Sequence, residues 1–177
     1  MTSDHPLDKF LFCPVCGSPH FAEHNFKSKH CEACGFTYYA NPCSATAAFI
    51  RNSRGELLVA VRGKEPAKGT LDLPGGFVDM DETAEEGILR EIREETALDI
   101  RTPLRYLFSL PNRYLYSGMV VHTLDMFYEA TVGDDATPHA DDDAAALAWM
   151  PMDEVMPERF GLHSIRLAVE KYRSHNT

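Results

Sequence analysis

The sequence lacks long apolar runs and any excess of positive charge. Although 44% of the 177 residues are hydrophobic, no apolar stretch reaches the roughly 18 residues that a membrane-spanning helix needs. The first ten residues also lack the basic start and apolar stretch of a signal peptide. Seventeen Lys and Arg residues stand against 27 Asp and Glu residues, which gives a formal net charge of −10. Because such a surface repels phosphate backbones, we do not expect the protein to bind duplex nucleic acid. From the missing apolar run and signal peptide, we expect a cytoplasmic protein that does not bind membranes.

Cysteine is sparse, but its spacing is informative. Four of the 5 cysteines form two Cys-x-x-Cys-Gly pairs, Cys13 with Cys16 and Cys31 with Cys34. Two residues between the thiols allow a tight turn that points both sulfurs at one position, and the glycine lets the backbone fold back. Two disulfides would instead need an oxidising compartment. We therefore predict a structural Zn²⁺ site in a small zinc ribbon over residues 1–40, which is too short to fold without its metal.

The remaining residues, 41–177, predict a second domain of mixed secondary structure. A capping box formed by Thr83 and Glu86 predicts the start of a helix that ends near Ala97. Apolar, β-rich runs predict strands over residues 45–50, 57–61, 104–110, 119–132 and 144–150, and a closing helix is expected over residues 160–172. Because helices and strands are intermixed without strict alternation, we expect an α+β fold with a mixed sheet between helices.

The helix predicted to begin after Thr83 carries three carboxylates on one face. Glu91, Glu94 and Glu95 fall within about a 100° arc of one another. Carboxylates this close repel one another, and the helix dipole disfavours negative charge near the C-terminal end. Mg²⁺ or Mn²⁺ would relieve both costs, because these hard cations prefer oxygen ligands. Considered alone, the same residues also fit a solvated charged face paired with neighbouring arginines.

The residues around these glutamates resemble the Nudix box, Gly-x5-Glu-x7-Arg-Glu-U-x-Glu-Glu-x-Gly-U, in which U is aliphatic. The matching positions are Gly76, Glu82, Arg90, Glu91, Ile92, Glu94, Glu95 and Leu98. The sequence departs from the pattern at Ala97, where the family has glycine. A glycine there suits a left-handed helix C-cap, and alanine in that conformation costs about 1 kcal/mol. From about residue 41 to its end, the sequence thus resembles a Nudix hydrolase with the α/β/α sandwich of that family.

The resemblance implies hydrolysis of the pyrophosphate in a nucleoside diphosphate that is linked to another group. In this interpretation the carbonyl of Gly75 and the carboxylates of Glu91, Glu94 and Glu95 hold Mg²⁺ or Mn²⁺. Arg90 is expected to orient one of these carboxylates.

The general base varies within the family. It is either a glutamate of the box or an acid on a later loop, and here Asp142 and Asp143 are the later candidates. Glu129 is a weaker candidate for the general base.

A zinc ribbon ahead of a Nudix domain resembles the architecture of the NADH pyrophosphatases. Residues 108–114 do not match their Ser-Gln-Pro-Trp-Pro-Phe-Pro-x-Ser signature. A small nucleotide substrate such as ADP-ribose or a related derivative is therefore favoured over NADH, with Arg113 and Tyr114 as candidates for phosphate and base contact. A hydrolase of RNA ends would need a basic track, which the sequence does not concentrate. A nucleotide-sensing regulator, a binding module that uses the ribbon, and a homodimer stay open as alternatives.

Overall fold

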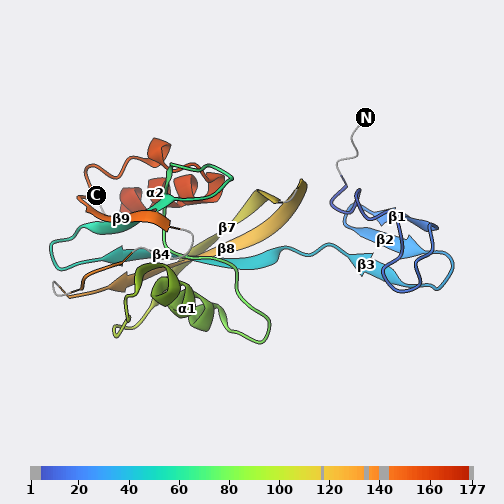
Figure 1. The fold of residues 1–177 in the computed structure, drawn as a ribbon, viewed down its shortest axis with the longest axis horizontal. Coiled ribbons are helices and arrows are strands. Elements are labelled where there is room, and N and C mark those ends of the chain that lie inside the picture. The colour runs from blue at the N-terminus through green and yellow to red at the C-terminus, as the bar shows by residue number, and fades with distance from the viewer. Residues whose placement is uncertain (1–4, 117, 134–135, 140–143, 176–177) are drawn as a thin grey trace. The chain divides into compact units, whose positions relative to one another are not determined.

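The computed structural model describes residues 5–116, 118–133, 136–139 and 144–175. The chain divides into two compact units (Figure 1). The first comprises Met1–Pro42 with Arg113–His122, and the second comprises Cys43–Asn112 with Thr123–Thr177. Among the described residues, no helix is long and apolar enough to cross a membrane.

The first unit contains a small antiparallel sheet with the strand order β1-β2-β3. Its strands are β1 (Phe21–Asn25), β2 (Ser28–Cys31) and β3 (Thr37–Tyr39). The buried cluster is small, consisting of Cys13, Phe21 and Cys31 with Phe10 and Phe36 packed against them. A core of this size buries too little apolar surface to stabilise a fold by itself, as expected of a metal-dependent ribbon.

The second unit is organised around a mixed sheet of 6 strands. The strands are β4 (Cys43–Arg51), β5 (Leu57–Arg62), β6 (Leu71–Asp72), β7 (Arg105–Tyr116), β8 (Met119–Thr131) and β9 (Ala144–Met150). The strand order is β6-β5-β4-β8-β7, and β9 pairs with β5. The central pair, β4 and β8, is parallel, whereas β5 pairs antiparallel with β4, β6 and β9.

Helices cover both faces of this sheet, with α1 (Ala84–Thr96) on one side and α2 (His163–His175) on the other (Figure 1). The alternation of side chains along β4 explains the two layers. Ala47 and Phe49 belong to the core cluster that contains the buried residues of α2. Ala48 and Ile50 belong to the cluster that contains the buried residues of α1. The predicted α+β sandwich with a mixed sheet is therefore confirmed.

Most predicted strand boundaries lie within two residues of those observed, and two elements differ by three residues or more. The strand predicted over residues 104–110 continues through Pro111 as β7. Proline is tolerated there because β7 is the last strand in the sheet order, so the missing N–H need not serve a neighbour on the open side. The closing helix starts at His163, after a 3-10 turn (Pro157–Arg159), because Phe160 is used as a fully buried core residue.

Candidate active site

Helix α1 begins and ends as its sequence predicts. The hydroxyl of Thr83 accepts a hydrogen bond from the backbone N–H of Glu86 at 3.2 Å, and the Glu86 carboxylate accepts one from the N–H of Thr83 at 2.8 Å. The helix ends at Ala97, whose φ of 57° and ψ of 14° are left-handed. Ile88 and Ile92 are buried in the core and fix the rotation of the helix about its axis. This rotation keeps the glutamate-bearing face beside the core rather than inside it.

The Pro-Gly-Gly segment pairs with the first half of β4, on the side where β5 pairs with the end of the same strand. The N–H of Ala48 donates to the carbonyl of Pro74 at 2.9 Å, and the N–H of Thr46 donates to that of Gly76 at 2.8 Å. Gly75 has a φ of 151°, and a Cβ atom there would overlap the backbone of Thr46. Glycine is therefore required at this position by the close approach of two backbones.

This segment contacts two of the three predicted metal-binding glutamates. The N–H of Gly75 donates to the Glu95 carboxylate at 2.9 Å. A Cβ atom on Gly76 would lie 2.6 Å from the carboxyl carbon of Glu91, so the Glu91 carboxyl packs directly against the glycine backbone. The structure thus brings Gly75, Gly76, Glu91 and Glu95 together, although Gly75 and Glu95 are far apart in the chain.

Arg90 connects the remaining carboxylates of the box. Its Nε and Nη2 atoms each donate to one oxygen of Glu82 at 3.0 Å. Its Nη1 atom donates to Glu91 at 2.8 Å and to Glu94 at 3.1 Å. Its Nη2 atom also donates to the carbonyl of Phe77 at 3.0 Å. Bidentate pairing of this kind fixes both the guanidinium and the carboxylate in orientation.

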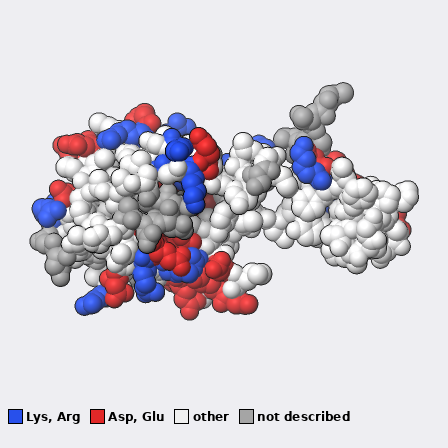
Figure 2. Space-filling view, in the orientation of Figure 1, with Lys and Arg blue, Asp and Glu red and all other residues white. Residues whose placement is uncertain are grey.

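The electrostatics of the site oppose the charge on Glu91. Burial raises the pKa of the Glu91 carboxyl above its usual value, and the neighbouring charges of Glu94 and Asp79 raise it further, while Arg90 opposes the shift. The hydrogen bond from Arg90 holds the pKa of Glu82 below its usual range. Acidic side chains gather over the α1 side of the second unit (Figure 2). An arrangement of this kind favours a cation at the glutamates.

The four predicted zinc ligands converge in the first unit. The sulfur of Cys13 lies 3.7 Å from that of Cys34, and the sulfur of Cys16 lies 3.6 Å from that of Cys31. All four sulfurs lie within 4.8 Å of one another. A tetrahedral ion with Zn–S bonds of about 2.3 Å separates its sulfurs by about 3.8 Å. The sulfur positions are therefore compatible with zinc.

The glutamates of α1 are arranged differently from the cysteines. Among the residues that the structure describes, the cysteines form the only group of three or more Cys, His, Asp or Glu side chains gathered closely enough to hold one ion. Of the three glutamates, Glu91 and Glu94 share the partner Arg90, whereas Glu95 is bound by the Gly75 N–H.

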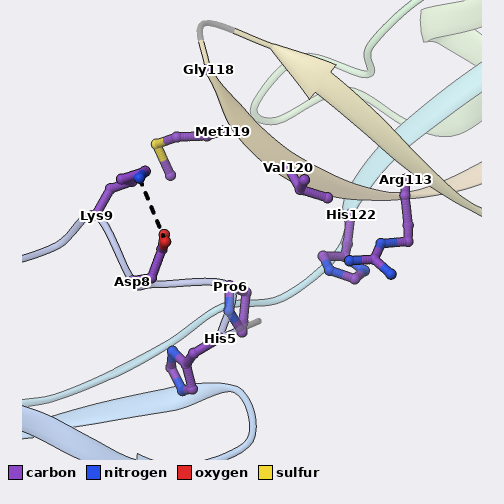
Figure 3. A pocket seen from close by; sticks show the side chains of 9 residues that line it. All are labelled: His5, Pro6, Asp8, Lys9, Arg113, Gly118, Met119, Val120 and His122. Carbon is purple, nitrogen blue, oxygen red and sulfur yellow. Dashed lines mark ion pairs between the residues drawn. The ribbon is translucent and has the colours of Figure 1, made fainter. Parts of the chain in front are cut away.

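The predicted substrate residues Arg113 and Tyr114 lie on β7 and belong to the first unit, whereas the glutamates belong to the second. Arg113 lines a hollow together with His5, Lys9 and His122 (Figure 3). The His5 ring accepts from the N–H of Leu7 and donates to the carbonyl of Asn25, so it is used to fix the N-terminal segment. Tyr114 stacks on Tyr116 with 6.3 Å between ring centroids.

The candidates for a general base are only partly described. Asp142 and Asp143 lie outside the described residues. Glu129 lies on the face of β8 that packs against α2, where it accepts hydrogen bonds from Tyr172 and Arg105. It is therefore on the opposite face of the sheet from α1.

Sequence reasoning missed the contact between Tyr128 and α1. The Tyr128 hydroxyl donates to the carboxylate of Glu85 at 2.9 Å. Burial and the Glu85 carboxylate raise the pKa of Tyr128 to about 12. The contact joins the first turn of α1 to the C-terminal part of β8, and no local pattern in the sequence could have indicated a pair so distant along the chain.

Two solved structures share the fold of this chain. The crystal structure of a Nudix hydrolase from Nitrosomonas europaea superposes with a TM-score of 0.67 at 17% identity, covering 93% of this chain and 90% of that one. The Nudix domain of Shewanella oneidensis NrtR, solved with ADP ribose, gives a TM-score of 0.64 at 21% identity, and the match covers 78% of this chain and 91% of that one.

Proteins of assigned function are also similar in sequence. The chain is 28% identical over 168 residues to the NAD-capped RNA hydrolase NudC of Stutzerimonas stutzeri, which covers 94% of this chain and 57% of that protein. It is 37% identical over 105 residues to the ADP-ribose pyrophosphatase of Methanocaldococcus jannaschii, and this match covers 57% of this chain and 62% of that protein. The chain thus spans little more than half the length of these curated relatives. A family model for the NUDIX domain matches residues 41–168, and the chain therefore belongs to the Nudix family.

Proposed function

We propose that this chain hydrolyses the pyrophosphate bond of a nucleotide derivative with the help of Mg²⁺ or Mn²⁺ held at α1. The observation that carries the proposal is the contact of the α1 glutamates with the Gly75–Gly76 backbone. Glu91 packs against Gly76, and Glu95 accepts the N–H of Gly75. This contact brings carboxylate oxygens from a helix and a peptide segment from the sheet to one place.

The donor set fits a hard divalent cation. Glu91, Glu94 and Glu95 would supply carboxylate oxygens, and the carbonyl of Gly75 would supply a further one. The close approach at Gly76 supports this assignment, because a Cβ atom there would lie 2.6 Å from the Glu91 carboxyl carbon and would displace that carboxylate. When bound, the cation would lower the pKa of a coordinated water and offset charge that develops on the phosphoryl oxygens.

The protein's own groups would orient the reaction. Before the cation binds, Arg90 would orient Glu91 and Glu94 through Nη1, and the Gly75 N–H would orient Glu95. The proton of the attacking water would pass to a glutamate of the box or to Asp142 or Asp143 on the later loop. Among the box residues, Glu94 has the more exposed side chain at 54%, against 16% for Glu91, and is better placed to exchange a proton with solvent.

For the substrate, we favour ADP-ribose or a related nucleotide derivative. The relatives are named for hydrolysis of NAD-capped RNA and of ADP-ribose, and both substrates contain a pyrophosphate that joins adenosine to another group. Arg113 and Tyr114 are proposed to contact phosphate and base. The matching family model begins at residue 41, which supports residues 41–177 as the hydrolase domain and residues 1–40 as a separate ribbon.

For the ribbon, we propose a structural zinc ion held by Cys13, Cys16, Cys31 and Cys34. Four thiolates leave no open coordination position, so this metal would stabilise the fold and take no part in hydrolysis.

A substrate panel tests the proposed reaction. Purified protein with Mg²⁺ or Mn²⁺ is incubated with ADP-ribose, NADH, NAD-capped RNA, diadenosine polyphosphates and nucleoside triphosphates, and the products are identified by mass. Selective cleavage between two phosphates of one compound supports the proposal and names the substrate. Binding of metal and of a nucleotide without turnover of any compound would contradict it and favour a nucleotide sensor.

A further inference from the structure

The Arg90 side chain is divided between two sets of acceptors. An arginine has five N–H groups, and the bonds to Glu82, Phe77, Glu91 and Glu94 account for all of them. The Nε and Nη2 side of the guanidinium is bound to Glu82 and to the carbonyl of Phe77. The Nη1 side is bound only to Glu91 and Glu94, which are two of the proposed metal ligands.

We infer that Arg90 Nη1 supplies the counter-charge for Glu91 and Glu94 as long as no divalent cation is bound, and that cation binding displaces Nη1 from them. This inference rests on the proposed function, because it takes Glu91 and Glu94 as ligands. The Glu82 and Phe77 contacts would hold the rest of the guanidinium in place during the exchange. Arg90 is thus a positioning residue that also competes with the metal.

The distances support competition rather than simple coexistence. Nη1 lies 2.8 Å from a Glu91 oxygen, and Mg²⁺ binds a carboxylate oxygen at about 2.0–2.1 Å. A cation on the same oxygen would therefore lie within roughly 5 Å of Nη1, where like charges repel strongly. The Arg90 side chain is only 25% exposed, so solvent screens this repulsion incompletely.

The arrangement of the glutamates agrees with this account. Nη1 binds Glu91 and Glu94, whereas the Gly75 N–H binds Glu95 at the turn. Each carboxylate is already satisfied, so the repulsion among them does not disrupt the helix. The site is ordered in advance, and the affinity for metal is reduced by the energy needed to release Nη1.

Arg93 offers a matched control for a metal-binding experiment. It lies on the same helix, is exposed, and pairs with Asp99 at 3.8 Å rather than with a glutamate of the site. R90Q and R93Q therefore remove the same charge from α1, but only R90Q removes the competitor. Mn²⁺ affinity is measured from the electron paramagnetic resonance signal of free Mn²⁺ at one ionic strength.

We expect R90Q to bind Mn²⁺ on the order of tenfold more tightly than R93Q. Equal or weaker binding by R90Q would overturn the inference, because a purely orienting arginine improves the site for metal and its loss weakens binding.

A second measurement uses the wild-type protein and does not depend on the folding of a variant. Nitrogen-15 NMR of the Arg90 guanidinium is followed during titration with Mg²⁺. We expect hydrogen exchange at Nη1 to accelerate as Mg²⁺ saturates the site, while the Nη2 and Nε protons stay protected by Glu82 and the Phe77 carbonyl. Unchanged Nη signals in the Mg²⁺-bound protein would refute the inference alone, whereas failure of the wild-type protein to bind Mg²⁺ or Mn²⁺ would refute the proposed function itself.

Discussion

Replacing Ala97 by glycine should stabilise the second unit. Ala97 ends α1 in the left-handed conformation, with a φ of 57°. An alanine in this region costs about 1–2 kcal/mol, whereas glycine adopts it freely. The side chain of Ala97 is exposed, so its removal loses no core packing. The C-cap hydrogen bond to the Arg93 carbonyl uses the backbone N–H and is retained.

The expected gain follows from two opposing terms. Relief of the left-handed strain contributes about 1–2 kcal/mol, and the greater freedom of glycine in the unfolded chain removes about 0.4–1 kcal/mol of it. The difference spans about 0–1.6 kcal/mol, and we therefore expect A97G to raise the free energy of unfolding by about 0.8 kcal/mol. For a domain of this size the midpoint temperature should rise by roughly 1–4 °C.

Fluorescence of Trp149 provides the assay. It is the only tryptophan in the sequence, and it packs against the core cluster that contains Ile88 and Ile92 of α1. Urea unfolding followed at this residue therefore reports on the unit that contains the helix. As a control, A84G places glycine at the first residue of α1, where the backbone is helical and not left-handed, and should not stabilise the unit. An A97G variant that is no more stable than the wild type would refute the reasoning about the cap.

Three further perturbations test other parts of the structure. In G76A the new Cβ atom would lie 2.6 Å from the Glu91 carboxyl carbon, so we expect Mn²⁺ affinity in the resonance assay to fall at least about tenfold; wild-type affinity would contradict the packing. Removal of zinc by a strong chelator should unfold the β1–β3 sheet, as seen by loss of amide protection there, while the Trp149 emission stays unchanged. A protected sheet in metal-free protein would count against the four-thiolate site. Burial opposes the charge of Glu129, but hydrogen bonds from Tyr172 and Arg105 hold its pKa below the usual value. Its contribution to stability is therefore present above about pH 4.3, the unfolded value, and is lost as the pH falls through the lower folded pKa. The stability difference between wild type and E129Q should shrink below that pH, and a constant difference from pH 7 to pH 3 would argue against the assigned contacts.

The features that the sequence predicts well are those encoded by neighbouring residues. The capping box of Thr83 and Glu86 lies within one helical turn, and the left-handed C-cap at Ala97 follows from the end of the same helix. The cysteine pairs likewise encode their turns locally, and Gly17 and Gly35 adopt positive φ values of 72° and 78°. These expectations needed no knowledge of tertiary contacts.

The features that the sequence could not predict depend on packing between distant segments. The bond from Tyr128 to Glu85 joins separate elements, and the approach of Gly76 to Glu91 is indicated only by the family resemblance and not by neighbouring residues. The partition of the Arg90 guanidinium between Glu82 and the metal-site glutamates depends on side-chain rotamers that a spacing pattern does not encode. The antiparallel pairing of β9 with β5 likewise joins strands that are far apart in the sequence, and neither strand alone indicates its partner.

The central claim is that the α1 glutamates hold the metal on which hydrolysis depends. The most direct measurement is the rate of pyrophosphate cleavage as a function of Mg²⁺ for the wild type, E94Q, E95Q and the control E170Q, which makes the same change at an exposed residue of α2. We predict at least about a hundredfold loss of rate for E94Q and E95Q, close to 3 kcal/mol of transition-state stabilisation, and a rate within about twofold of wild type for E170Q. Full activity with an unchanged Mg²⁺ dependence in E94Q and E95Q would contradict the account.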